Sequence, residues 1–274
     1  QAFIVGGGTD PAIGLKFIHR RVLPALLNDS RLWARDPCHL IDVGAASYGP
    51  VAGYDYSDSL LFVSSCRQCT IHAFDLSAAK LLELRSLAGN GSSSLRTYQV
   101  ALSDRDGKAT IRTPAGRQSA VNIWSIAGDQ YLRASAGEVR TLTLDSFVQA
   151  RGIRSIRYAK VDVQGHDPQV ALGMQRLLRE RRVGIATFEY SQHWQPPDSL
   201  ASFQAWAGGM GYATYLVAAD ASRQRPRLVR ASGDDWRPAL EMCTPGGGRR
   251  CVIDLLVVEA HSLLERELLR LVRG

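Results

Sequence analysis

Four short segments combine polar side chains with turn-forming residues, and each directly follows a short apolar run. They are Asp42-Val-Gly-Ala45, Asp75-Leu76, Ser103-Asp104 and Asp162-Val-Gln-Gly-His-Asp167. A carboxylate such as Asp75 can accept two hydrogen bonds from ribose hydroxyls, and Ser103-Asp104 is placed to recognise an adenine amino group. Gly44 lets the backbone approach a ligand closely. Together and in this order, the four segments predict a nucleotide-type binding site.

Several side chains close to the later segments could move a proton. Asp162 is the first candidate for orienting a substrate or cofactor. His166 and His193 are candidate bases because an unperturbed histidine has a pKa near 6.5, and Glu189 is the alternative proton acceptor. Asp162, Glu189 and Asp167 could together hold a divalent cation, but their spacing does not require one, and we predict no metal.

Two aromatic residues lie close to Glu189 in the sequence. Tyr190 and Trp194 could stack on the face of a sugar, or they could pack in the core. The sequence leaves both alternatives open.

The elements that would position these residues alternate between short apolar strands and amphipathic helices from residue 39 onwards, which is typical of a parallel sheet with crossover helices. We expect the last two strands to be joined by a hairpin. The prediction is an α/β fold with a seven-stranded, mostly parallel, doubly wound sheet whose last strand is antiparallel. Ligands of such sheets bind beyond the carboxyl ends of the strands. The predicted strands are residues 39–43, 70–74, 97–102, 157–163, 183–190, 211–218 and 252–259, with an additional strand at 108–112.

The expected domain organisation is simple. Residues 1–38 form an N-terminal extension that is helical over 15–27, and residues 39–274 form one domain with an inserted loop or lid around 113–138. Ser77 is a good N-cap for a helix over 78–88, and Asp145 is placed to cap a short helix. Asp167 and Pro168 predict the start of a helix that reaches about residue 182. The predicted buried side of helix 78–88 consists of Leu81, Leu82, Leu84 and Leu87.

The composition is that of an ordinary globular domain. Of the 274 residues, 45% are hydrophobic and 22% are charged. No window approaches the run of about 18 apolar residues that a membrane span needs. The chain begins with Gln1 rather than Met, so we expect that an upstream piece was removed, and a signal peptide or anchor could have been part of it.

The net charge of +7 and the pI near 9.4 would suit a nucleic-acid partner. However, the basic residues are spread along the whole chain, and only four of the 33 are lysines. We therefore expect a solvated basic surface and no nucleic-acid partner.

The five cysteines do not form a zinc-binding pattern. Cys66 and Cys69 form a CxxC motif without a second pair at zinc-finger spacing. Cys243 and Cys251 bracket a glycine-rich turn that would bring two strand ends together. A disulfide between them in an oxidising compartment and two free thiols in a reducing one are both open.

The polar segments resemble those of the FkbM-type methyltransferase family. The sequences of that family contain six short segments in a fixed order. The segments are a strand followed by Asp-Val-Gly-Ala, then Ala-Phe-acidic, Ala-Leu-Ser-Asp-x-x-Gly, Thr-Leu-Asp, Lys-x-Asp-Val-Glu-Gly-x-Glu with a following hydrophobic-Gly helix, and Phe-Glu. The corresponding segments here are Ile41-Asp-Val-Gly-Ala45, Ala73-Phe-Asp75, Ala101-Leu-Ser-Asp-Arg-Asp-Gly107, Thr143-Leu-Asp145, Lys160-Val-Asp-Val-Gln-Gly-His-Asp167 with Leu172-Gly173, and Phe188-Glu189.

The resemblance implies a Rossmann-like class I methyltransferase fold, S-adenosylmethionine as cofactor, and O-methylation of a hydroxyl, commonly on a sugar, glycan or natural product. On this basis the cofactor-binding residues are Asp42, Gly44, Ala45, Asp75, Leu76, Ser103 and Asp104. The catalytic candidates are Asp162, His166, His193 and Glu189.

The sequence departs from the family pattern at the predicted site. Ala46 stands where the family usually has Asn, and Gln164 and Asp167 stand where it usually has Glu. The loss of a carboxylate at 164 motivates an alternative, in which the domain keeps the fold but serves as a binding or assembly module. An adenine N-methyltransferase would need an Asn/Asp-Pro-Pro-aromatic segment after Asp162, and a cytosine C5 enzyme would need a nucleophilic cysteine there. Neither is present.

Overall fold

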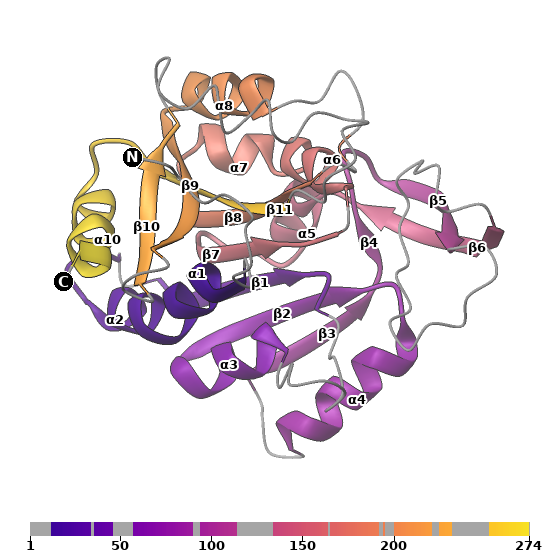
Figure 1. Cartoon of the computed structure of the whole chain (residues 1–274). Coiled ribbons are helices and arrows are strands. Elements are labelled where there is room, and N and C mark those ends of the chain that lie inside the picture. The colour runs from indigo at the N-terminus through magenta and orange to yellow at the C-terminus, as the bar shows by residue number, and fades with distance from the viewer. Residues whose placement is uncertain are drawn as a thin grey trace.

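The computed structural model describes residues 12–33, 36–45, 57–89, 94–113, 134–163, 165–191, 194, 200–220, 225–231 and 252–273. Its centre is an eight-stranded sheet with the order β10-β9-β11-β8-β7-β1-β2-β3 (Figure 1). The strands of this sheet are β1 Cys38–Val43, β2 Cys69–Asp75, β3 Leu95–Gln99, β7 Ile156–Val161, β8 Val183–Ser191, β9 Tyr212–Asp220, β10 Arg225–Arg230 and β11 Val252–Glu259.

The strand directions confirm the predicted doubly wound topology. Strands β3, β2, β1, β7 and β8 are parallel neighbours, and β11 runs antiparallel to both β8 and β9. The chain order reverses between β1 and β7, which is where ligands bind in such sheets. The strand count is eight rather than seven, because β10 pairs antiparallel with β9 at the edge. Its sequence, Arg-Pro-Arg-Leu-Val-Arg, has no strong strand pattern.

A second, three-stranded sheet has the order β4-β6-β5 and consists of β4 Ala101–Leu102, β5 Gly107–Thr113 and β6 Ala134–Leu142. Two expectations change here. The predicted strand over 97–102 is interrupted at Val100, so its two parts belong to different sheets. The predicted loop around 113–138 is a strand from Ala134 onwards, because β6 pairs along β5. Residues 114–133 lie outside the described residues.

Helices cover both faces of the central sheet (Figure 1). Apolar side chains of α5, α6, α7 and α8 form one core with one face, and those of η1, α2, α3 and α10 form a second core with the other face. Helix α4 contributes Leu84 to a small cluster on the second face. The bounds are α1 Ala12–Phe17, η1 Ile18–Val22, α2 Leu23–Asn28, α3 Asp58–Ser65, α4 Ala78–Ala88, α5 Leu144–Ala150, α6 Asp167–Leu172, α7 Gln175–Arg179, α8 Leu200–Gly209 and α10 Leu263–Arg273.

The N-terminal helical segment contains a π-helical turn. Helices α1 and α2 are continuous through η1, and Pro24 follows this turn. Proline has no N–H to donate, and its ring collides with the carbonyl four residues earlier in a regular α-helix. The wider π turn removes this conflict, so the helix continues. His19 lies within the turn and is 1% exposed.

Helix α4 begins as predicted but buries a narrower stripe. The Ser77 hydroxyl accepts the Lys80 N–H at 3.3 Å. Leu81 and Leu84 are buried, whereas Leu82 and Leu87 are 62% and 58% exposed. The expectation that all four leucines are buried is therefore wrong. A helix at the edge of the sheet has one stripe in contact with it, and these two leucines lie outside that stripe.

The predicted helix over 167–182 is divided at Gly173 into α6 and α7. A Cβ atom at Gly173 would lie 2.0 Å from the carbonyl oxygen of Ser103, so only glycine permits this approach. His166, rather than Asp167, occupies the N-cap position of α6.

Asp145 does not cap its own helix. The Thr143 hydroxyl accepts the Ser146 N–H at the start of α5. The Asp145 carboxylate instead accepts the backbone N–H groups of Arg176 and Leu177, at 3.0 Å each. It therefore caps α7, and the Thr-Leu-Asp segment connects two helices.

Candidate active site

Gly44 directly follows β1 and packs closely against the residue that follows β7. Its φ is +77°, and a Cβ there would lie 1.9 Å from the carbonyl oxygen of Asp162. The N–H groups of Gly44 and Ala45 donate to the Phe74 carbonyl at the end of β2, at 2.9 and 3.0 Å. The ends of the three neighbouring strands are thus held together by a backbone that a larger residue could not adopt.

Lys160 lies at the centre of a buried group of charges. Its Nζ is 3.2 Å from Asp162, 3.4 Å from Asp58 and 3.7 Å from Asp42. Lys160 and Asp162 are two residues apart near the end of β7, and Asp42 is in register with Lys160 on β1. Burial alone would lower the pKa of Lys160, but the three carboxylates outweigh burial and raise this pKa well above its usual range. Lys160 is therefore a buried, permanent cation.

A second layer of polar side chains supports this cation. His19 Nδ1 lies 2.8 Å from Asp58, and its Nε2 lies 2.5 Å from the Tyr158 hydroxyl. The Ser59 hydroxyl donates to Asp42 at 2.5 Å. Burial raises the pKa of Asp42, whereas His19 and Lys160 overcome the same effect of burial at Asp58 and lower its pKa.

This layer was not predicted from the sequence. The cation that it supports, Lys160, stands at the start of the family segment Lys160–Asp167, which is the signal that could have identified it. No local pattern connects His19 with Tyr158, which is 139 residues further along the chain.

Two of the predicted catalytic residues, Asp162 and Glu189, form a carboxyl pair. Burial, followed by the charge of Asp162 and a hydrogen bond with that side chain, raises the pKa of Glu189 well above its usual range. Lys160 contacts Asp162 from the other side. The pair therefore combines a carboxylate beside a cation with a carboxyl group of increased basicity.

Asp167 has a structural role. It is fully buried, and its two oxygens accept the N–H groups of Glu189, at 3.1 Å, and Gly165, at 3.2 Å. Burial raises its pKa well above the usual range. Because both oxygens already accept hydrogen bonds, Asp167 is poorly suited to join Asp162 and Glu189 as a metal ligand. Among the residues that the structure describes, the one potential metal-ligating cluster is Cys38, Cys66 and Cys69.

Tyr190 and Trp194 pack in the core. They are 6% and 2% exposed, and their rings form an edge-to-face pair with centroids 4.8 Å apart. The Trp194 indole N–H donates to the Glu189 carbonyl at 2.9 Å. These residues therefore hold the backbone of Glu189 in place, and they have no free face for a sugar.

Ser103, Asp104 and His166 are brought together from two distant segments. The Ser103 hydroxyl donates to Asp104 at 2.9 Å and lies 3.0 Å from His166 Nε2. Burial lowers the pKa of His166 to about 4, against the effect of Asp104. His166 is therefore neutral and a weak base at neutral pH, and it belongs to the predicted adenine-binding side.

The remaining predicted cofactor residues lie at the end of β2 and beside it. Asp75 accepts the Ser77 N–H at 2.8 Å, and burial raises its pKa. Leu76 packs against Ala101 and Val139 of the small sheet. Asp42 and Ala45 are 0% and 2% exposed.

The family model described as the methyltransferase FkbM domain matches residues 42–217, which is more than half of the chain. The chain belongs to the FkbM methyltransferase family. Its central sheet has the strand order and the antiparallel β11 of the class I methyltransferase fold, with β10 as an added edge strand. The family implies S-adenosylmethionine as the methyl donor.

Solved structures with a similar fold include other methyltransferases. One is the methyltransferase FkbM from Methylobacillus flagellatus KT, with a TM-score of 0.44 and 13% identity over 91% of this chain and 55% of that chain. The chain thus spans about half the length of that protein. A second is the METTL16 methyltransferase domain, with a TM-score of 0.43 and 10% identity over 93% and 71% of the two chains. A third is the precorrin-6y C5,15-methyltransferase from Geobacter metallireducens GS-15, with a TM-score of 0.39 and 10% identity over 86% of each chain. No curated protein matches the chain.

Some predicted features of this FkbM domain lie outside the described residues. They are the candidate base His193, the departures at Ala46 and Gln164, and the expected proximity of Cys243 and Cys251. These stay predictions. In the described parts of the chain, no helix is both long and apolar enough to span a membrane.

Three other cysteines of the FkbM domain meet beneath the amino ends of β1 and β2. Cys38, Cys66 and Cys69 are all buried, and Cys69 lies within bonding distance of both other sulfurs. Because a sulfur atom forms only one disulfide, the two pairings are alternatives, and the third cysteine is a thiol. The sequence did not predict this cluster, because the parallel register of β1 and β2 places Cys38 beside Cys69.

Proposed function

We propose that this chain is an S-adenosylmethionine-dependent O-methyltransferase that acts on a hydroxyl of a sugar, glycan or natural-product acceptor. The observation that carries the proposal is the carboxyl pair Asp162 and Glu189 beside the buried cation Lys160. Asp162 directly follows β7, beside the switch point between β1 and β7, and Glu189 lies on the neighbouring β8. O-methylation needs a group that accepts a proton, which this pair can supply.

The residues present at the neighbouring strand ends fit the cofactor. The Asp75 carboxylate suits ribose hydroxyls, the linked Ser103 and Asp104 suit the adenine amino group, and Leu76 offers an apolar contact. Gly44 and Ala45 lie on the tight backbone turn after β1, and this turn is hydrogen-bonded to the Phe74 carbonyl at the end of β2. Asp42 is fully buried, so we assign it a positioning role through Ser59 and Lys160. When bound, the cofactor supplies an electrophilic methyl group on a sulfonium.

The chain itself supplies orientation and proton transfer. Asp162, beside the positive charge of Lys160, can accept a hydrogen bond from a donor group of the acceptor other than the reacting hydroxyl, and so orient that hydroxyl toward Glu189. Glu189 takes the hydroxyl proton. Its raised pKa makes it a stronger base than an ordinary carboxylate once it is ionised. His166 is the less suitable base because burial lowers its pKa to about 4.

The test combines cofactor binding with transfer of a labelled methyl group. Calorimetry with S-adenosylhomocysteine should detect binding, and Asp75→Ala should weaken it. A panel of glycans and small alcohols should then yield a methyl ether that mass spectrometry locates on oxygen. Methylation on nitrogen or carbon would overturn the assignment. Binding without transfer to any member of a broad panel would favour the alternative of a binding module.

A further inference from the structure

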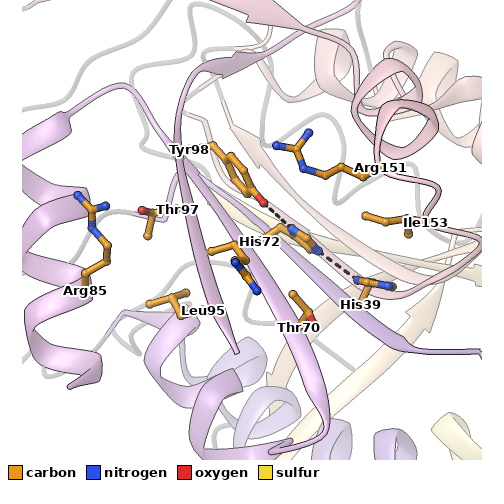
Figure 2. A pocket seen from close by; sticks show the side chains of 10 residues that line it. His39, Thr70, His72, Arg85, Leu95, Thr97, Tyr98, Arg151 and Ile153 are labelled. Atoms are coloured by element: carbon orange, nitrogen blue, oxygen red, sulfur yellow. Dashed lines mark hydrogen bonds between the residues drawn. The ribbon is translucent and has the colours of Figure 1, made fainter. Parts of the chain in front are cut away.

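A hollow lies at the end of the central sheet opposite to the predicted cofactor site. It has a volume of about 670 Å³ and is bordered by the first residues of β1, β2 and β3, including His39, Thr70 and Leu95. Figure 2 shows Arg85 on α4 to one side of it and Arg151 at the end of α5 to the other. Thr70 precedes Asp75 by five residues on β2, so the hollow is roughly 16 Å from the predicted cofactor site. This volume is in the range of small-molecule sites.

The charged residues that line the hollow are arginines. They are Arg85, Arg96 and Arg151, and no aspartate or glutamate lines the hollow among the residues that the structure describes. A smaller hollow of about 400 Å³ shares Tyr98 and Arg151 with it and adds Arg140, and its described lining residues likewise include no acidic one.

These arginines differ from others on the surface. Arg31 and Arg181, for example, form ion pairs with carboxylates. The side chains of Arg85 and Arg96 form neither a hydrogen bond nor an ion pair with any other residue in the described parts of the chain. The Arg151 guanidinium lies over the rings of Tyr98 and Phe147, with distances of 4.7 and 4.1 Å from its Cζ to the ring centroids. These are cation–π contacts, so they leave the positive charge of Arg151 without a neutralising carboxylate in the described parts of the chain.

A chain of hydrogen bonds crosses one wall of the hollow. His72 Nε2 lies 3.1 Å from His39 Nδ1, and His72 Nδ1 lies 3.1 Å from the Tyr98 hydroxyl (Figure 2). Burial, His39, Arg151 and Arg96 lower the pKa of His72 to about 3, so its ring is neutral and carries one N–H. If that N–H donates to Tyr98, the tyrosine O–H is left over as a donor. If it donates to His39, the Nε2–H of His39 is left over. Either arrangement provides one free donor to a bound acceptor.

We propose that this hollow is a binding site for a small phosphorylated ligand. Arginines from α4, β3 and the end of α5 line the hollow, and this number of charged donors suits the several oxygens of a phosphate group better than the two of a carboxylate. The hollow is larger than one phosphate group needs, so the remaining volume accommodates an organic body, with Thr70 and Thr97 as hydroxyl partners. The site is separate from the predicted methyl-transfer centre, and its existence does not depend on the proposed function.

The test is calorimetric titration of the intact chain with pyrophosphate, at constant ionic strength and in a buffer without multivalent anions. Binding is expected, and it should persist when the protein is saturated with S-adenosylhomocysteine. Arg96→Ala and Arg151→Ala should each weaken binding about tenfold or more, the usual effect of losing a charge-assisted hydrogen bond. Both arginines are exposed, so the variants should fold, and circular dichroism checks this.

Arg179→Ala is the matched control. Arg179 is an exposed arginine on α7 outside both hollows, and its loss removes the same charge. Pyrophosphate should bind this variant as tightly as the parent. Equal weakening in Arg179→Ala and Arg96→Ala would overturn the proposal, because it would indicate a response to net charge alone. Absence of pyrophosphate binding, equal affinity for acetate, or loss of binding in the presence of S-adenosylhomocysteine would also overturn it.

Discussion

At the scale of single residues, neighbouring charges and burial determine what the acidic groups near β7 can do. Asp162, Asp167 and Glu189 are all carboxylic acids within one small region, yet their surroundings differ. Asp162 contacts a buried lysine, Asp167 accepts two backbone N–H groups, and Glu189 is partly buried beside another carboxyl group. We therefore assign substrate orientation, loop structure and proton transfer to these three residues respectively.

The first prediction concerns Asp162. Asp162→Asn preserves the shape of the side chain but removes the charge that faces Lys160, and methyl transfer should fall at least about a hundredfold. The fold should be retained because Asp162 lies after the end of β7 and is not part of the apolar core. Initial rates with labelled cofactor measure the effect, and circular dichroism measures folding. Unchanged activity would place the reaction centre elsewhere.

The second prediction is the pH dependence of catalysis. A proton acceptor must be ionised, and the pKa of Glu189 is raised, so kcat should fall as the pH drops through that raised pKa. Glu189→Gln should be slow at every pH and should lose this limb of the profile. His166→Ala should keep the limb, because the pKa of His166 is lowered to about 4. A profile that is flattened by His166→Ala instead would identify the histidine as the base.

At the scale of elements, close backbone contacts determine where helices and strands end. Gly44 lies against Asp162, so it allows the ends of β1 and β7 to approach each other. Gly173 lies against Ser103, so it allows the break between α6 and α7 to pack against the end of β4. Asp145 lies in α5, but its carboxylate caps α7.

The third prediction tests the break between α6 and α7. Gly173→Ala places a methyl group 2.0 Å from the Ser103 carbonyl, and the forced shift should reduce the free energy of unfolding by about 1–3 kcal/mol. Urea denaturation measures this change. Gly208→Ala in α8 is the control, because its added methyl group meets only Gln204 at 4.0 Å. That variant should be up to about 1 kcal/mol more stable, since alanine favours the helix. Equal effects of the two changes would contradict the close contact.

The fourth prediction concerns the three buried cysteines. The Cα atom of Cys69 is 4.4 Å from that of Cys38 and 5.4 Å from that of Cys66, and both separations permit a disulfide. Alkylation of the denatured, oxidised protein should therefore leave Cys69 unmodified and label Cys38 or Cys66. Peptide mass spectrometry in a Cys243→Ser/Cys251→Ser background identifies the labelled residue. A Cys38–Cys66 disulfide with a labelled Cys69 would contradict the arrangement.

At the scale of the whole molecule, one sheet carries two polar regions at its opposite ends. The carboxyl ends of β1, β2, β7 and β8 gather acidic groups around Lys160, and the amino ends of β1, β2 and β3 gather arginines and histidines. Both regions contain buried titratable groups. The stability of the whole fold should therefore depend on pH.

The fifth prediction is acid destabilisation through His72. Its pKa is about 6.5 when unfolded and about 3 when folded, so the unfolded chain binds more protons between these values. The contribution of neutral His72 is complete above pH 6.5 and is lost as the pH falls toward 3. The loss between pH 7 and pH 5 lowers the free energy of unfolding by about 2 kcal/mol. Urea denaturation measures the free energy of unfolding at both pH values. The decrease in this free energy from pH 7 to pH 5 should be smaller for His72→Gln than for the parent. An equal difference would show that His72 does not titrate in this way.

The sequence by itself determined the fold class and the order of the site segments. Each strand end is marked locally by an apolar run followed by a polar turn, and parallel strands bring their carboxyl ends to one edge. The positions of Asp75, Ser103-Asp104, Asp162 and Glu189 along the chain could therefore be predicted, as could the N-cap Ser77. These features depend on neighbours within a few residues.

Only the tertiary structure decided which side chains contact one another across large sequence separations. The partnership of His19 with Tyr158, the meeting of Cys38 with Cys69 and the approach of Gly173 to Ser103 depend on strand register and helix packing. The same holds for proton affinities, since a carboxyl group such as Glu189 acquires its raised pKa from burial and a neighbouring charge. The physical reason is that burial and charge pairing are properties of three-dimensional surroundings, which local sequence patterns do not encode.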